Sequence, residues 1–231
     1  MQTLTSVLAD RPYPGRGVLL ARADDGALGV VYFLTGRSEG SRRRALAVRA
    51  GGDVAVEDTS SGPHDALRHY VAVARRGTWL VVGNGDQVVP LAESLSTGES
   101  VAQAWGAHTF EPDPPIFTTR VWVALDAASA ADGVVGAARR SGRSVDGGDD
   151  STDHLAWTAG HVAPGTGVLM TTYDGSTSEV RSTAAPVDVA APAATLEALL
   201  DQVWDGLDPA LRVAALAVDA GSPAAPPLLR A

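Results

Sequence analysis

Arginines beside glycines and hydroxyl groups are the residues of this chain whose types and spacing most suggest chemistry. Arg16 lies between two glycines, four arginines fall within residues 37–44 beside Ser38, and Arg120 follows two threonines. A guanidinium group donates two parallel hydrogen bonds to a phosphate, and the backbone amides of a turn can add to them. These clusters predict anion binding, with a solvated surface of salt-bridged arginines as the alternative.

The charge balance narrows the identity of this anion. The chain has 27 acidic residues against 18 basic ones, a formal net charge of −9, which argues against a surface that coats nucleic acid. All 18 basic residues are arginine. The absence of lysine excludes a Schiff base, a lysine general base and a Walker-type phosphate lysine. A small anionic substrate would therefore be held by arginines, backbone amides and hydroxyl groups.

We expect no metal ion and no bound cofactor. The chain has no cysteine, which excludes a disulfide framework, a thiolate zinc site and a cysteine nucleophile. His64 and His69 are five residues apart and His154 and His161 are seven apart. Neither spacing places a pair on one helix face. The acidic stretch 146–153 lacks the ligand spacing of a calcium loop and is expected to be a surface loop.

The chain is expected to work in the cytoplasm without a membrane partner. No apolar run approaches the roughly 18 residues that span a bilayer, because glycine, aspartate or arginine interrupts each one. The first residues lack the basic and apolar segments of an export signal. Whether the chain forms a homo-oligomer stays open.

Paired apolar runs predict antiparallel strands. Residues 17–22 and 27–35 flank an Asp-Gly turn and predict a hairpin, and residues 45–49 and 54–57 flank a Gly-Gly-Asp turn in the same way. Further strands are expected at 67–74, 78–82, 119–125, 134–138, 154–157, 167–173 and 213–218.

Helices are expected in two places. One or two helices are predicted over 86–105, and an apolar face over 196–204 recurs at helical spacing up to Gly206. The proline-rich segment 110–115 is expected to be extended, and the tail 221–231 to be mobile. Many antiparallel strands with few helices predict one α+β domain over residues 1–231.

Several short motifs follow one another along the chain. They are Tyr13-Pro14-Gly15-Arg16-Gly17, Gly36-Arg37-Ser38-Glu39 with Ser41, Arg42 and Arg44, Asn84-Gly85-Asp86-Gln87, and Phe110-Glu111-Pro112-Asp113 with Thr118 and Arg120. In order and spacing over residues 12–120, they resemble the archaeal-type IMP cyclohydrolase family, which includes bacterial members. Thr171-Thr172-Tyr173-Asp174-Gly175 extends the likeness more weakly, and the family usually has asparagine where Gly40 and Arg43 stand.

The resemblance implies a four-layer αββα sandwich of the Ntn-hydrolase-like kind. It also implies an enzyme of purine biosynthesis, in which 5-formamidoimidazole-4-carboxamide ribonucleotide loses water and becomes inosine monophosphate (IMP). The carboxamide nitrogen attacks the formyl carbon of the same molecule, and no redox group or carrier is needed. The implied partner is therefore a purine nucleotide.

The resemblance also implies which residues bind the substrate. Arg37 and Ser38, with Arg42 or Arg44, are expected to hold the phosphate. The other residues expected in the cleft are Arg16 and Arg120, which line it, and Asn84 and Asp86, which contact the imidazole carboxamide or the ribose.

Glu111 is the residue expected to handle protons, with Asp86 and Tyr13 as further candidates. The prolines after it make its segment stiff, so that its side chain is presented at little entropic cost. The alternative is that Glu111 only pairs with a nearby arginine.

Two other functions stay open. A purine-nucleotide-binding or sensor protein on the same fold could keep the phosphate site and lack turnover, and Gly40 and Arg43 leave room for this. A structural domain could use its arginines only in surface salt bridges.

Overall fold

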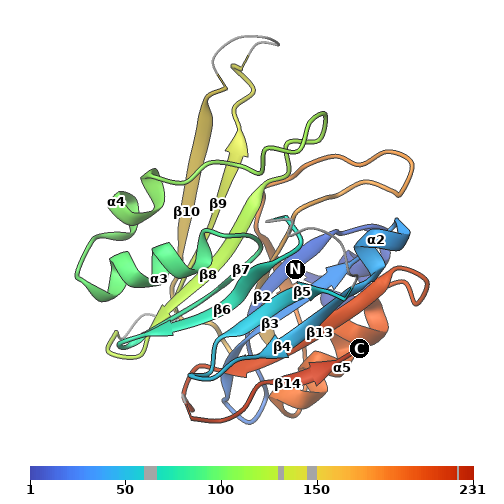
Figure 1. Cartoon of the computed structure of the whole chain (residues 1–231). Helices are drawn as coiled ribbons and strands as arrows, with labels where there is room; N and C mark the ends of the chain where they lie inside the picture. The colour runs from blue at the N-terminus through green and yellow to red at the C-terminus, as the bar shows by residue number, and fades with distance from the viewer. Residues whose placement is uncertain (60–66, 130–132, 145–149, 223) are drawn as a thin grey trace.

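Two seven-stranded sheets run through the structure (Figure 1), a computed structural model that describes residues 1–59, 67–129, 133–144, 150–222 and 224–231. In spatial order, the first sheet consists of β1 (Gln2–Thr3), β12 (Val187–Ala190), β11 (Thr166–Thr171), β2 (Arg16–Arg22), β3 (Leu28–Thr35), β13 (Arg212–Asp219) and β14 (Leu228–Arg230). The second consists of β10 (Thr152–Ala159), β9 (Gly133–Arg140), β8 (Arg120–Asp126), β7 (Trp79–Gly83), β6 (Tyr70–Arg76), β5 (Val54–Asp58) and β4 (Arg44–Val48).

The strands pair mostly antiparallel, as predicted. The expected hairpin over 17–22 and 27–35 is confirmed as β2 and β3, in which Arg22 pairs with Leu28 across the turn. Among the described pairings of named strands, β1 with β12 is parallel and the others are antiparallel. The chain is therefore an α+β protein.

The helices are short and flank the sheets. They are α1 (Leu4–Ala9), α2 (Glu39–Arg42), α3 (Val88–Ser96), α4 (Val101–Gly106) and α5 (Leu196–Gly206). The predicted apolar face of α5 is confirmed, and the Thr195 hydroxyl caps it by accepting from the Ala198 amide at 3.2 Å. Helices α1 and α2 were not predicted, because six and four residues give little periodic signal.

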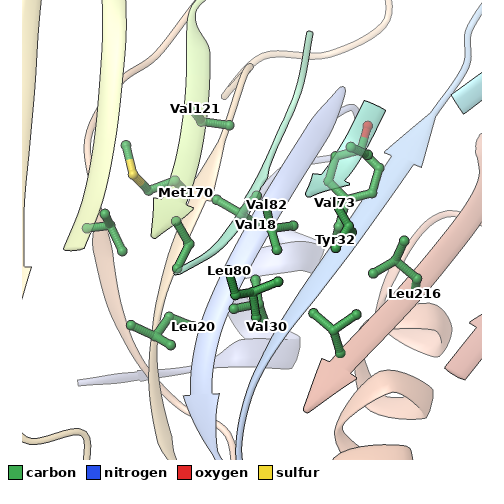
Figure 2. Packing of buried hydrophobic residues seen from close by; sticks show 14 of the residues in the cluster. Val18, Leu20, Val30, Tyr32, Val73, Leu80, Val82, Val121, Met170 and Leu216 are labelled. Carbon is green, nitrogen blue, oxygen red and sulfur yellow. The ribbon is translucent and has the colours of Figure 1, made fainter. Parts of the chain in front are cut away.

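Successive side chains along each strand of the first sheet point to opposite faces, and both faces are apolar. Val18 and Leu20 of β2 belong to a buried cluster shared with the second sheet, and Figure 2 shows them beside Leu80 and Val82. Leu19, between them, belongs to a different cluster, shared with α1 and α5. Fully burying such a side chain contributes about 1.5–3 kcal/mol. The period-2 pattern therefore packs one face of this sheet on the other sheet and the opposite face on helices.

The second sheet is packed in the same way. Val81 of β7, next to Val82, contributes to a third cluster together with Leu91 of α3 and Trp105 of α4. The Trp105 indole donates to the Ala137 carbonyl at 3.1 Å, which ties α4 to β9. Figure 1 shows α3 and α4 beside this sheet and α5 beside the first.

One end of the two sheets collects the motifs that the sequence analysis singled out. Strands β2 and β8 begin there, β3, β7 and β11 end there, and α2 joins β3 to β4. Antiparallel pairing therefore brings together segments that are far apart in the sequence.

Two expectations are wrong in part. The tail 221–231 was expected to be mobile, but Leu228–Arg230 forms β14 on the free edge of β13, and Arg230 pairs with Asp201 of α5 at 2.7 Å. The segment 110–115 is not extended throughout, because the Asp113 carbonyl accepts from the Ile116 and Phe117 amides in a turn. This turn lets the Glu111 amide donate to the Thr118 carbonyl at 2.9 Å.

Strand β11 ends two residues before its predicted limit. The Thr172 amide donates to the Arg16 carbonyl at 2.8 Å, and the Tyr173 amide donates to the Pro14 carbonyl at 3.2 Å. These bonds tie the end of β11 to the start of β2.

In the described parts of the chain, no helix is both long enough and apolar enough to cross a membrane.

Candidate functional site

A cleft of about 220 Å³ lies at the end of the sheets where the motifs meet. Its walls come from segments on both sheets and from the connections between them. The lining residues are Tyr13, Gly15, Arg16, Thr35, Ser41, Arg44, Leu67, Arg68, Glu111, Asp113 and Tyr173. The structure therefore brings together Tyr13, Arg16, Arg44 and Glu111 of the predicted site.

A buried ion pair forms part of the cleft. Arg16 Nη2 donates to Glu111 Oε2 at 2.9 Å, and both side chains are less than a tenth exposed. The second carboxylate oxygen, Glu111 Oε1, accepts from the side-chain Nδ2 of Asn84 at 3.0 Å. Glu111 thus has a defined orientation, since both of its oxygens are held by groups on other strands or turns.

Asn84 is itself fixed by the backbone around it. It is 0% exposed, its Nδ2 also donates to the Thr119 carbonyl at 3.2 Å, and its Oδ1 accepts from the Val121 amide at 2.6 Å. Gly85, which follows, has φ +103°, and a Cβ there would lie 2.7 Å from Gln87 Oε1. Only glycine suits this turn, which aims Asn84 at Glu111.

Burial has the net effect at Glu111 but not at Arg16. It raises the pKa of Glu111 above its ordinary value, although the charge and hydrogen bond of Arg16 oppose the shift. The pKa of Arg16 is also raised, because Glu111 and nearby tyrosines outweigh the opposing effect of burial. A carboxyl group with a raised pKa at an open cleft can exchange a proton nearer to neutral pH than an exposed one.

Two stacked tyrosines form another part of the wall. The ring centroids of Tyr13 and Tyr173 lie 5.6 Å apart, and the angle between the ring planes is 23°. The hydroxyl of Tyr173 lies 2.7 Å from Thr118 Oγ1, which donates to Asp113 Oδ2 at 2.5 Å. Burial raises the pKa of Tyr173, with Arg16 opposing. This chain of hydroxyls and a carboxylate offers donors and acceptors at the cleft.

The wall on the side of α2 is basic. Arg44 Nε donates to the Ser41 carbonyl at 2.8 Å, and its Nη2 donates to the Thr35 carbonyl at 2.9 Å. These bonds fix Arg44 at the start of β4. Ser38 caps α2 through the Ser41 amide at 3.1 Å, so its hydroxyl has a structural role in the helix turn.

Other predicted site residues lie beside the cleft and do not line it. Arg37 is exposed, and its Cζ lies 5.9 Å from the Tyr13 ring centroid. Its Nη1 donates to the Thr177 carbonyl at 2.9 Å. Arg42 is exposed on α2. Arg120 forms an ion pair with Asp86, whose side chain is mostly exposed. The structure thus pairs Asp86 with Arg120, and neither residue lines the cleft.

Seven of the lining residues were not among the predicted site residues: Gly15, Thr35, Ser41, Leu67, Arg68, Asp113 and Tyr173. Asp113 and Tyr173 belong to motifs that carry the resemblance, so a signal for them was present. Arg68 stands before β6 in a segment without a recognisable motif. Only the fold shows that Arg68 faces the same cleft as Glu111.

A larger cavity of about 670 Å³ lies at the opposite end of the sheets. Its arginines bind backbone carbonyls, since Arg75 donates to Asp219 at 2.8 Å and Arg22 donates to Val162 at 2.9 Å. Volume alone therefore does not identify the site. The smaller cleft combines an oriented buried carboxyl with several arginines, which is the better candidate for chemistry.

The described residues contain no group of three or more His, Asp or Glu side chains placed to hold a metal ion. His64 and residues 146–149 of the acidic stretch lie outside the described residues. Asp150 and Asp153 are paired with arginines, Asp150 with Arg140 at 2.8 Å and Asp153 with Arg143 at 2.7 Å.

Comparison with known proteins adds one finding. A family model described as IMP cyclohydrolase-like protein matches residues 13–221. A search of curated proteins found no match.

Proposed function

The chain belongs to the IMP cyclohydrolase-like family, and from this premise we propose that it closes the purine ring of 5-formamidoimidazole-4-carboxamide ribonucleotide to give IMP and water. The observation that carries the proposal is the Glu111 carboxylate, held by Arg16 and Asn84 in a cleft with further arginines. This arrangement offers a proton carrier and several cationic groups to the same small anionic substrate. The proposed reaction takes place without a metal ion or cofactor and belongs to purine biosynthesis.

Ring closure needs a bond between two groups of one molecule. The carboxamide nitrogen adds to the formyl carbon, which becomes tetrahedral as the C=O double bond opens and its oxygen becomes an oxyanion. An amide nitrogen is a weak nucleophile, so holding the two groups face to face supplies much of the rate. The stacked rings of Tyr13 and Tyr173 offer a rigid apolar surface against which a planar imidazole can lie.

Protons move in two stages. Glu111 takes one proton from the carboxamide nitrogen and returns it to the formyl oxygen, giving a hydroxyl group. The formamido nitrogen then gives up its own proton, which Glu111 passes to that hydroxyl, so that the hydroxyl leaves as water while the C=N bond forms. Arg16, adjacent to Glu111, donates to the oxyanion while it exists.

The same proposal extends to the fold family. We propose that the chain is a four-layer αββα sandwich of the Ntn-hydrolase-like kind. Three buried clusters support this, one shared by the two sheets and one between each sheet and its helices.

The test is to mix the purified protein with the formamido nucleotide and follow the absorbance of the new purine ring. A thermal shift with IMP is measured in parallel, since ligand at about 100 times its dissociation constant adds roughly 2.7 kcal/mol of stability. We expect turnover proportional to protein concentration together with a higher melting temperature. A shift without turnover would indicate a nucleotide-binding or sensor protein, and neither signal would indicate a structural role.

A further inference from the structure

Arg68 fills the space beside Gly40 that any other residue would occupy with its side chain. A Cβ on Gly40 would lie 2.9 Å from Nη1, 3.1 Å from Nη2 and 3.2 Å from Cζ of Arg68. The guanidinium group therefore packs directly on the backbone of α2. Glycine at this position permits the contact by lacking a side chain, since its backbone is not in the left-handed region.

A carboxylate on β5 holds the same guanidinium group. Arg68 Nη1 donates to Asp58 Oδ2 at 3.2 Å, and the Asp58 side chain is only 6% exposed. This arginine is held by a helix backbone on one side and by a buried carboxylate on the other. It therefore has little conformational entropy left to lose when a ligand binds. Arg68 is thus preorganised where it lines the cleft.

Two arginines of the cleft lie against α2, because Arg44 donates to the Ser41 carbonyl and Arg68 packs on Gly40. Glu111, in contrast, is already paired with Arg16. A dianionic phosphate is attracted by the two arginines beside α2 and repelled by the carboxylates of Glu111 and Asp113. Arg44 already donates through Nε and Nη2 to backbone carbonyls, which fixes its position and engages part of its fork.

We propose that Arg68, seated against Gly40 and Asp58, binds the phosphate of the purine nucleotide and thereby places the nucleotide's base against the wall that carries Glu111. The identity of the ligand rests on the proposed function. The assignment itself goes beyond it, because it moves the phosphate from the exposed Arg37 and Arg42 to the inner side of α2.

The first test compares a ligand with and without phosphate. Dissociation constants for IMP and inosine are measured by calorimetry for the wild-type protein and for Arg68→Ala. We expect the variant to lose about tenfold or more in affinity for IMP, the range for a charge-assisted hydrogen bond, and to bind inosine as before. Arg49→Ala is the control, because Arg49 forms a comparable half-exposed ion pair with Glu57.

The second test moves Arg68 without changing it. In Gly40→Ala, the new Cβ pushes the guanidinium group away, and the far end of a flexible side chain yields at little cost in stability. Alanine also favours a helix more than glycine. We expect an unchanged or higher melting temperature with a loss in IMP affinity of about three- to tenfold, as a displacement near 1 Å can cause. Gly106→Ala in α4, where a Cβ meets nothing within 4 Å, is the control and should leave IMP affinity unchanged.

The outcomes separate this proposal from the proposed function. Equal losses for IMP and inosine, or no loss in either variant, would overturn the role of Arg68. So would a selective loss of IMP affinity in Arg37→Ala but not in Arg68→Ala. If the wild-type protein binds IMP but does not close the ring, the proposed function fails while the binding tests still decide on Arg68. If it does not bind IMP at all, both fail.

Discussion

Two clusters of arginines and carboxylates lie in different surroundings and differ in what they can do. The Arg16–Glu111 pair is buried, at 2.9 Å. The other cluster lies at the ends of β9 and β10, where Asp153 pairs with Arg143 at 2.7 Å and Arg143 is 80% exposed. The exposed contact is the shorter one.

Distance alone therefore does not rank these ion pairs. Water screens the exposed pair and competes for its hydrogen bonds, so a short contact there contributes little. Burial removes that screening, and breaking the pair would leave a charge without solvent. The same burial raises the pKa of Glu111, whereas Ser141, Arg143 and Arg139 outweigh the opposing effect of burial and lower the pKa of Asp153.

The largest effect is expected at Glu111. Glu111→Gln removes the proton carrier and should lower kcat and kcat/KM together by about 100- to 10,000-fold, with IMP affinity nearly intact. Steady-state kinetics with the formamido nucleotide measures this. Glu57→Gln, in an exposed pair on β5, is the control. If Glu111→Gln melts earlier but turns over at the wild-type rate at saturation, Glu111 only pairs with Arg16, and Asp86 or Tyr13 becomes the candidate carrier.

Stability should separate the two clusters next. Arg16→Leu leaves Glu111 buried without its partner and should cost about 3–5 kcal/mol in the free energy of unfolding. Arg143→Ala should leave the denaturation midpoint essentially unchanged. Urea titrations of both variants test this, and Arg16→Leu combined with Glu111→Leu should recover part of the loss. Equal effects in the two single variants would show that burial does not distinguish the clusters.

The pH dependence should have opposite signs at the two carboxylates. The raised pKa of Glu111 means that the folded chain keeps this proton to higher pH than the unfolded chain. Its contribution to stability falls as pH rises from the ordinary glutamate value through the raised pKa. The lowered pKa of Asp153 contributes stability above the ordinary aspartate value, and this is lost as pH falls through the lowered pKa. Carboxyl ¹³C NMR titration checks both directions, and a shift of the same sign at both sites would contradict the comparison.

The smallest effect is expected from removing metal ions. Dialysis against a chelator should leave turnover unchanged, because the described residues contain no cluster suited to a metal ion. An activity that is lost on dialysis and restored by zinc or magnesium would show that the cleft works with a metal.

The sequence could predict elements whose signal is local. The hairpin of β2 and β3 has an Asp-Gly turn between apolar runs, and α5 has a regular apolar face over several turns. Helix α1 has only six residues, too few for a regular apolar pattern. Strand β14 forms because β13 offers it an open edge, which a short window of residues does not reveal.

The site was predictable only where motifs carried it. Tyr13, Arg16, Arg44 and Glu111 lie in such motifs, and they line the cleft together. Arg68 has no motif, and its place depends on how β4, β5 and β6 pair beside α2. Contacts between segments distant in sequence are set by tertiary pairing, which local patterns do not encode.

The central claim is most directly tested with substrate labelled by ¹³C at the formyl carbon. The NMR signal of the label is followed in the presence of the wild-type protein. The account predicts that the formyl signal is replaced by that of C2 in the hypoxanthine ring, at a rate set by the protein concentration. A label that stays in the formamide while the nucleotide raises the melting temperature, or one that appears as formate, would contradict it.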